Sequence, residues 1–136
     1  MTRLTRFLAP VAILAVLGTG LILAGASRAQ VQRSRAEFMR VKLDFSKRIL
    51  EGLTVENYDA ITKSARSLKM LSQAAEWEVP TIPHVEDYLA YTTEFQRICD
   101  ELGAKARDRN IDGATLAYVK LTMSCVNCHK YVRASK

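Results

Sequence analysis

The sequence predicts an all-α fold: an antiparallel, up-down-up-down four-helix bundle preceded by an N-terminal signal or anchor segment. Hydrophobic residues make up 49% of the 136 residues, whereas aromatic residues make up 7% and there are three prolines. This composition favours helices over a β fold with many turns. Four segments of about twenty residues each place apolar side chains at helical spacing, with short links between them. Amphipathic helices joined in this way form bundles, and the length is that of one domain.

The first 29 residues indicate an export signal. Two arginines precede an uncharged run over residues 7–27, and small residues follow towards the end of the segment. The run is long for a signal peptide and close to the length of a membrane span, so a retained membrane tether at residues 7–26 is the alternative. We therefore predict an export segment over residues 1–29, a four-helix domain over residues 30–136, and a periplasmic or otherwise exported location.

The charge of the domain that follows is mild and mixed in sign. The whole chain has a net charge of +6, but residues 1–29 hold three of its 20 basic residues and none of its 14 acidic ones. Their removal leaves 17 basic against 14 acidic residues, a net charge of +3. This balance does not indicate a nucleic-acid-binding surface. We find no acid–base pair, nucleophile array or phosphate-binding loop, so we do not expect an enzyme.

Apolar residues at helical spacing predict the first pair of helices. The first helix is expected from about Val31 to Leu50, and Gly52 is expected to end it in the left-handed conformation. Its apolar stripe consists of Phe38, Val41, Phe45 and Ile49. Thr54 is the expected N-cap of the second helix. The apolar positions of the second helix are Tyr58, Ile61, Ala65, Leu68 and Leu71.

The second pair of helices follows a link with two prolines, residues 76–84. The third helix is expected from about Val85 to Arg109, with apolar positions at Tyr88, Tyr91, Phe95, Ile98 and Leu102. Asp112 is the candidate N-cap of the fourth helix. The apolar positions of that helix are Tyr118, Leu121, Cys125, Cys128 and Val132. Two cysteines therefore point into the bundle near one of its ends.

The motif Cys125-Val-Asn-Cys128-His129 admits three interpretations. In a covalent haem site, the two thiols form thioethers with the haem vinyl groups and His129 coordinates the iron, which suits an exported chain. A zinc site would use the same three residues, but it needs a fourth ligand, and His84 and Cys99 are isolated. Reactive Cys-x-x-Cys disulfides occur at helix N-termini, whereas this pair is expected near a helix C-terminus. Covalent haem is the favoured interpretation.

With a four-helix bundle and this motif near the C-terminus, residues 31–136 resemble the class II c-type cytochromes, the cytochrome c-prime family. Arg35 and Met39 resemble the first-helix pair of the family, an arginine followed four residues later by the distal haem residue. Trp77 stands where a tryptophan commonly follows the second helix, and Arg133 lies four residues after the haem histidine, as is common in the family. One departure is visible. Many members of the family have a tyrosine three residues after the histidine, whereas this chain has Val132 there and its tyrosine, Tyr131, one residue earlier.

The resemblance implies one covalent haem c, with His129 as the proximal ligand of iron and Met39 on the distal side. It also implies a homodimer and the binding of small gases such as nitric oxide or carbon monoxide. One alternative is a low-spin, six-coordinate cytochrome that transfers electrons to a redox protein partner. Another is a haem subunit of a membrane-associated redox complex. The state of the sixth coordination site distinguishes the gas binder from the electron carrier.

Several of these residues have an ordinary structural role as the alternative. Met39 is a distal ligand, a lid over a vacant iron face, or a core side chain. Arg35 pairs with a haem propionate or is solvated. Arg133 keeps the proximal bond weak or complements the helix dipole. Cys99 is expected to be a buried free thiol and His84 a solvated loop residue.

Overall fold

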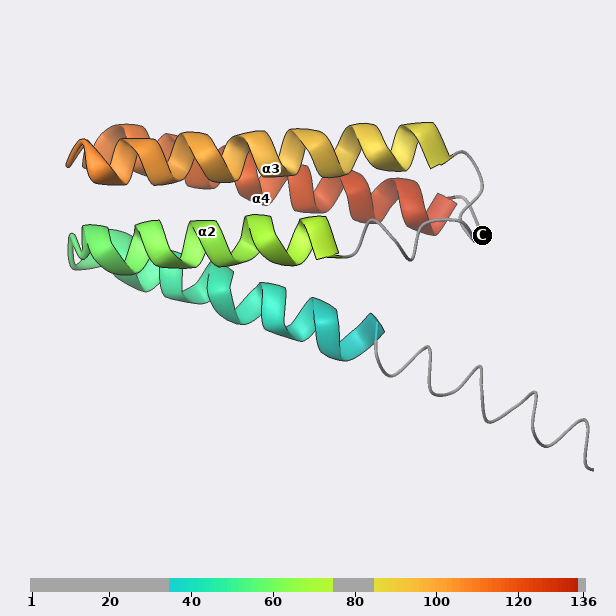
Figure 1. Cartoon of the computed structure of the whole chain (residues 1–136), viewed down its shortest axis with the longest axis horizontal. Helices are drawn as coiled ribbons and strands as arrows, with labels where there is room; N and C mark the ends of the chain where they lie inside the picture. The colour runs from blue at the N-terminus through green and yellow to red at the C-terminus, as the bar shows by residue number, and fades with distance from the viewer. Residues whose placement is uncertain (1–34, 75–84, 135–136) are drawn as a thin grey trace, which may run out of the picture. The chain divides into compact units, whose positions relative to one another are not determined.

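The computed structural model describes residues 35–74 and 85–134 (Figure 1). They form four helices and no strand. The helices are a first helix that covers the described residues 35–54, α2 (Tyr58–Ala74), α3 (Val85–Arg107) and α4 (Ile111–Ala134). The predicted all-α class is confirmed, and the helices are compatible with a four-helix bundle. The predicted export segment lies outside the described residues.

The chain divides into two compact units, Met1–Arg40 and Val41–Lys136. Of the first unit, the structure describes residues 35–40, which are helical. No helix within the described ranges is both long and apolar enough to span a membrane.

Consecutive helices of the second unit run antiparallel and pack against one another (Figure 1). α3 packs against both α2 and α4. The first helix reaches α4 through the hydroxyl groups of Ser46 and Tyr118, whose oxygens lie 3.2 Å apart. It reaches α3 through Lys42, whose ammonium lies 4.6 Å from the centre of the Phe95 ring. The helices therefore enclose one shared interior.

Two predicted helix ends are wrong by a few residues. The first helix continues through Gly52 to residue 54, and the reversal follows at Glu56, which takes a left-handed φ of 53°. Gly52 is buried, and a Cβ there would lie 2.9 Å from the Cγ1 of Ile61, so this glycine allows α2 to approach closely. α3 ends at Arg107 rather than Arg109, which also has a left-handed φ, of 54°.

Both predicted N-caps are also wrong, and asparagine takes each place. The side-chain oxygen of Asn57 accepts a hydrogen bond from the amide three residues later at 3.0 Å. Asn110 caps α4 in the same way at 2.8 Å. Thr54 instead donates to the carbonyl three residues before it, and Asp112 lies within α4. Asparagine satisfies the free amides of a first helical turn at least as well as threonine.

The buried core draws on all four helices. Its members are Ile49, Leu53, Ile61, Ala65, Leu68, Phe95, Ile98, Cys99, Leu102, Ala106, Ala114, Ala117 and Leu121. The predicted apolar faces of α2, α3 and α4 are thus largely confirmed. The predicted face of the first helix is partly wrong, because Val41 is 38% exposed. Its neighbour Lys42 is half-buried instead.

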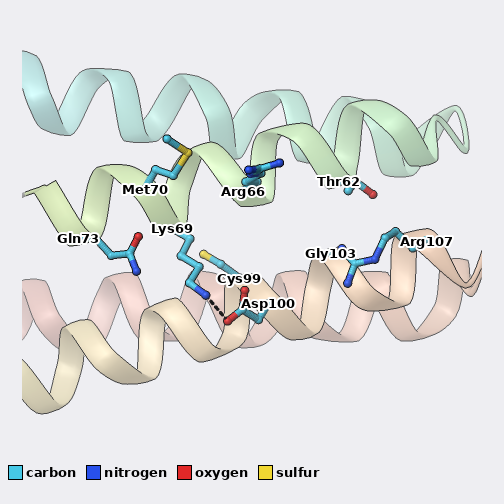
Figure 2. A pocket seen from close by; sticks show the side chains of 9 residues that line it. All are labelled: Thr62, Arg66, Lys69, Met70, Gln73, Cys99, Asp100, Gly103 and Arg107. Carbon is cyan, nitrogen blue, oxygen red and sulfur yellow. Dashed lines mark hydrogen bonds and ion pairs between the residues drawn. The ribbon is translucent and has the colours of Figure 1, made fainter.

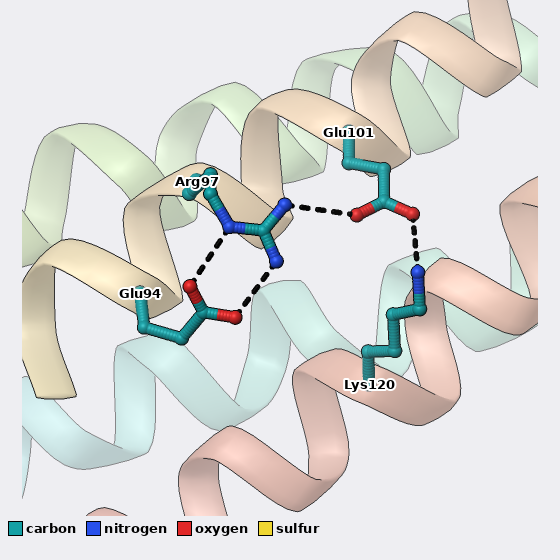
Figure 3. Close-up of polar contacts among 4 residues, drawn as sticks. All are labelled: Glu94, Arg97, Glu101 and Lys120. Carbon is teal, nitrogen blue, oxygen red and sulfur yellow. Dashed lines mark hydrogen bonds and ion pairs between the residues drawn. The ribbon is translucent and has the colours of Figure 1, made fainter.

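A chain of ion pairs joins α3 to α4 on the surface (Figure 3). Arg97 donates two hydrogen bonds to Glu94, at 2.7 and 2.8 Å, and one to Glu101. Glu101 also accepts a hydrogen bond from Lys120 at 2.6 Å, which crosses between the helices. This hydrogen bond lowers the pKa of Glu101. Exposed ion pairs stabilise proteins only slightly, so the core rather than this network holds α3 to α4.

Leu102→Ala is expected to lower the free energy of unfolding by about 2–5 kcal/mol. Leu102 is fully buried in the core of α3, so truncation removes apolar contacts and leaves a cavity. The matched control is Leu116→Ala on α4, where the side chain is 59% exposed and the expected change is within about 0.5 kcal/mol. Urea unfolding followed by circular dichroism measures both. Equal losses in the two variants would contradict this packing.

Candidate functional site

The two cysteines of the motif lie one helical turn apart on the inner side of α4. Cys125 and Cys128 are half-buried, and Cys125 packs against the core. His129 follows directly and is exposed. Both thiols are free. α4 therefore presents two thiols towards the interior and an imidazole on its flank.

Burial controls the acidity of these thiols. It raises the pKa of Cys125, while the nearby charge of Lys42 opposes the increase. The same two effects raise the pKa of Cys128. Redox-active Cys-x-x-Cys pairs need a thiol whose pKa is lowered, because the thiolate is the nucleophile. The raised pKa values therefore argue against a dithiol oxidoreductase.

Lys42 was missed by the sequence analysis. Its ammonium lies over the Phe95 ring, and burial lowers its pKa, with the thiols of Cys125, Cys128 and Cys99 as the neighbouring titratable groups. The sequence does hold a signal, because Lys42 falls on a helical stripe with apolar residues four before and three after it. A lysine at such a position therefore indicates a side chain that lies partly in the interior of the bundle.

Cys99 confirms the expectation of a buried free thiol. It is 2% exposed, and burial raises its pKa to about 12. It lies at the edge of a groove of about 660 Å³ between α2 and α3 (Figure 2). The Nζ of Lys69, on α2, lies 2.6 Å from the Oδ2 of Asp100, on α3, so this ion pair crosses the groove. The groove is separate from the motif, since no residue of α4 lines it.

One buried hydroxyl near the same level has no hydrogen-bond partner among the described residues. It belongs to Ser72, in the last turn of α2, which is 1% exposed. Ser72 lies one turn after Lys69, whose partner Asp100 adjoins Cys99. An unsatisfied buried polar atom is rare in folded proteins and requires an explanation.

Two tyrosine rings meet between α3 and α4 near the motif. The ring centroids of Tyr91 and Tyr131 lie 5.2 Å apart at an interplanar angle of 40°. Both residues are half-buried. Tyr131, on α4, stands two residues after His129. The structure places it against α3, so its ring covers this end of the helix pair.

The remaining predicted site residues are not brought together by the described structure. Arg35 and Met39 are exposed on the first helix and belong to the unit Met1–Arg40, so their relation to His129 stays a prediction. Arg133 is exposed in the last turn of α4, where a cation complements the helix dipole. Trp77 and His84 lie outside the described residues.

Cys99 is expected to resist alkylation in the folded, haem-free protein at pH 8. Its thiol is buried and its raised pKa leaves almost no thiolate, whereas Cys125 and Cys128 are more accessible. Iodoacetamide labelling followed by peptide mass spectrometry should therefore modify the motif cysteines first. The control is the same reaction in urea, which should modify all three. Labelling of Cys99 as fast as Cys125 in the folded protein would contradict the burial.

The arrangement offers two free thiols on one face of α4, with an imidazole directly after the second. Two thiols on one face can attach a flat group along one of its edges, and His129 can coordinate a metal at its centre. Within residues 35–74 and 85–134, no three His, Cys, Asp or Glu side chains gather as a metal site. No protein family, no curated protein and no solved structure matches this chain.

Proposed function

We propose that this protein is an exported monohaem c-type cytochrome of the cytochrome c-prime type that binds small gases such as nitric oxide or carbon monoxide. The observation that carries the proposal is the geometry of α4. Cys125 and Cys128 are free, half-buried and one turn apart, and the exposed His129 follows them. The export signal predicted over residues 1–29 supports it, because c-type haem is attached outside the cytoplasm.

The attachment chemistry needs only the groups that this site and a haem supply. Each thiol would add across one vinyl group of a bound haem, with the sulfur bonding to one vinyl carbon and the thiol hydrogen going to the other. No oxidant is consumed. Burial raises the pKa of both Cys125 and Cys128, which disfavours the thiolate through which a disulfide between them would form.

The chain's residues then have distinct roles. His129 would hold the iron, and Met39 is proposed to lie on the distal side of the haem without bonding to iron. Bound haem supplies an iron centre that takes up a small ligand or exchanges one electron. Arg35 is proposed to pair with a propionate, Trp77 to form part of the haem wall, and Arg133 to keep the bond from His129 weak. The protein acts as a binder rather than an enzyme.

The testing experiment is the absorption spectrum of the purified holoprotein, ferric and ferrous, before and after carbon monoxide. The proposal expects a broad high-spin ferrous spectrum that shifts when the gas is added. The matched control is Cys99→Ser, which leaves the motif intact and should give the same spectra. A sharp low-spin spectrum that ignores the gas would instead identify an electron carrier with a redox protein partner. A tightly bound zinc ion without haem would overturn the proposal altogether.

A further inference from the structure

The outer face of α4 carries a row of apolar side chains that no other described element covers. Leu116, Val119, Met123 and Val126 are between 39% and 59% exposed. Their spacings of three, four and three residues place them on one face of the helix. Single exposed apolar residues are normal on a protein surface, whereas a contiguous apolar patch marks an interaction site. We call these four residues the outer row.

The outer row faces away from the bundle to which α4 belongs. The buried residues of α4 are Ala114, Ala117, Leu121 and Ser124. Successive residues of a helix are about 100° apart, so this buried set and the outer row are centred on opposite sides of α4. The outer row is therefore not part of the core, and only a surface beyond the described residues can bury it.

The outer row is free of charged side chains along its length. Between Asp112 and Lys130, α4 has a single Asp, Glu, Lys or Arg residue, which is Lys120. The ammonium of Lys120 lies 2.6 Å from the Oε1 of Glu101, so it is held towards α3 (Figure 3). The outer row can thus be removed from water without burying an unpaired charge.

The spacing of the outer row is the same in both directions along α4. A second copy of α4 that lies antiparallel across the first would place Leu116 against the partner's Val126. The same register would place Val119 against the partner's Met123. Steps of three and four residues are those of helices that pack side by side. A patch that matches itself in this way suits a dimer with two-fold symmetry.

Opposite charges stand at the two ends of the outer row. Asp112 lies four residues before Leu116, and Lys130 lies four residues after Val126. Both are exposed, and neither makes an ion pair within residues 35–74 and 85–134. In the same antiparallel register, Asp112 of each copy would meet the partner's Lys130. The register that matches the apolar side chains therefore also matches the charges.

We propose that the outer row is the interface of a homodimer, in which α4 packs antiparallel against α4 of a second copy. This inference does not rest on the proposed haem, because no cysteine or histidine belongs to the outer row. One pair of helices makes an interface below the standard size, so the dimer should dissociate at micromolar concentrations. The unfolding of Leu116→Ala is accordingly measured below this range, where the chain is a monomer.

The test is sedimentation velocity of the purified holoprotein over a range of micromolar concentrations. The wild type should change from the mass of one chain to that of two as the concentration rises. Val119→Glu is expected to raise the dissociation constant by about a hundredfold or more, because a carboxylate would be buried against the partner's Met123. Circular dichroism checks that the variant folds, and Met123→Glu replaces it if it does not.

Leu43→Glu is the matched control for Val119→Glu. Leu43 and Val119 are each 53% exposed, and Leu43 lies on the first helix. A carboxylate at this position should leave the dissociation constant unchanged, because the first helix has no part in the proposed interface. The comparison separates a specific contact on α4 from the general effect of an added negative charge.

A charge exchange tests the antiparallel register. Asp112→Lys alone, or Lys130→Asp alone, would bring like charges together at both ends of the interface. Each should raise the dissociation constant by about threefold to tenfold. The double variant has opposite charges at both ends again and should recover the wild-type value. A different register would not show this recovery.

The outcomes distinguish this inference from the proposed function. A haem-loaded wild type that stays a monomer up to about 1 mM would overturn this inference alone. A dimer that is lost in Leu43→Glu but kept in Val119→Glu would overturn it too, since the contact would then lie on the first helix. Conversely, a protein without haem whose dimer is lost in Val119→Glu would support this inference and overturn the proposed function.

Discussion

Replacement of both Cys125 and Cys128 by serine is expected to abolish covalent haem attachment completely. The hydroxyl of serine does not add to a vinyl group as a thiol does, so neither bond to the porphyrin can form. Each single variant keeps one half-buried thiol of the pair and should retain a single thioether. Intact mass spectrometry of the exported protein measures the effect, as the loss of a mass increase equal to one haem.

Cys99→Ser is the matched control, because it removes a thiol that lies in the core rather than in the motif. It should carry the full haem mass. Thiol titration in denaturant counts the free cysteines directly. The chain has three cysteines, and two of them would be tied to haem, so the wild-type holoprotein should show one reactive thiol. Covalent haem in the double variant, or three free thiols in the wild-type holoprotein, would remove the basis of the proposed function.

Much of the fold could be predicted because helical spacing fixes which side chains share a face. The steps through Phe95, Ile98 and Leu102 identified the buried face of α3, and the structure confirms it. α4 shows the limit of this reasoning. Its most buried positions include Ala114 and Ala117, whose small side chains are easily overlooked in a search for large apolar residues. Both alanines are nonetheless members of the buried core.

The error on the first helix has a specific cause. Val41 and Lys42 are neighbours, so either can lie within the apolar arc, and periodicity alone does not decide between them. The facing helices decide: Phe95 offers an aromatic surface on which the lysine stem and ammonium can lie. A long lysine side chain can bury its apolar stem, which a simple polar assignment ignores. The contact between Lys42 and Phe95 therefore decides a choice that the spacing along the first helix leaves open.

The ends of the helices could not be predicted for a different reason. Thr54 and Asn57 are both good N-cap residues, and the choice depends on how far the preceding helix continues. That helix continues through Gly52 to residue 54, and Ile61 of α2 lies so close to Gly52 that a Cβ there would be 2.9 Å from its Cγ1. The turn between the first helix and α2 therefore follows residue 54, and Asn57 is the residue that caps α2.

His129→Ala is expected to remove the proximal ligand while leaving the haem covalently attached and the bundle folded. The thioethers depend on the two cysteines alone, so the haem mass should persist. Because His129 is exposed, its removal from the haem-free protein should change the free energy of unfolding by no more than about 0.5 kcal/mol. The ferrous spectrum should lose the signature of histidine coordination, and added imidazole, which can occupy the same coordination position, should restore it.

His84→Ala provides a matched control, because His84 is the other of the chain's two histidines. It should leave the ferrous spectrum and the response to carbon monoxide unchanged. If instead His84→Ala removed histidine coordination and His129→Ala did not, the ligand would come from the link between α2 and α3. The exposed flank of α4 would then have no part in the site. His129→Ala could also keep both the wild-type spectrum and the full haem mass. That result would contradict His129 as the iron ligand but not the covalent attachment, so the two claims can be tested separately.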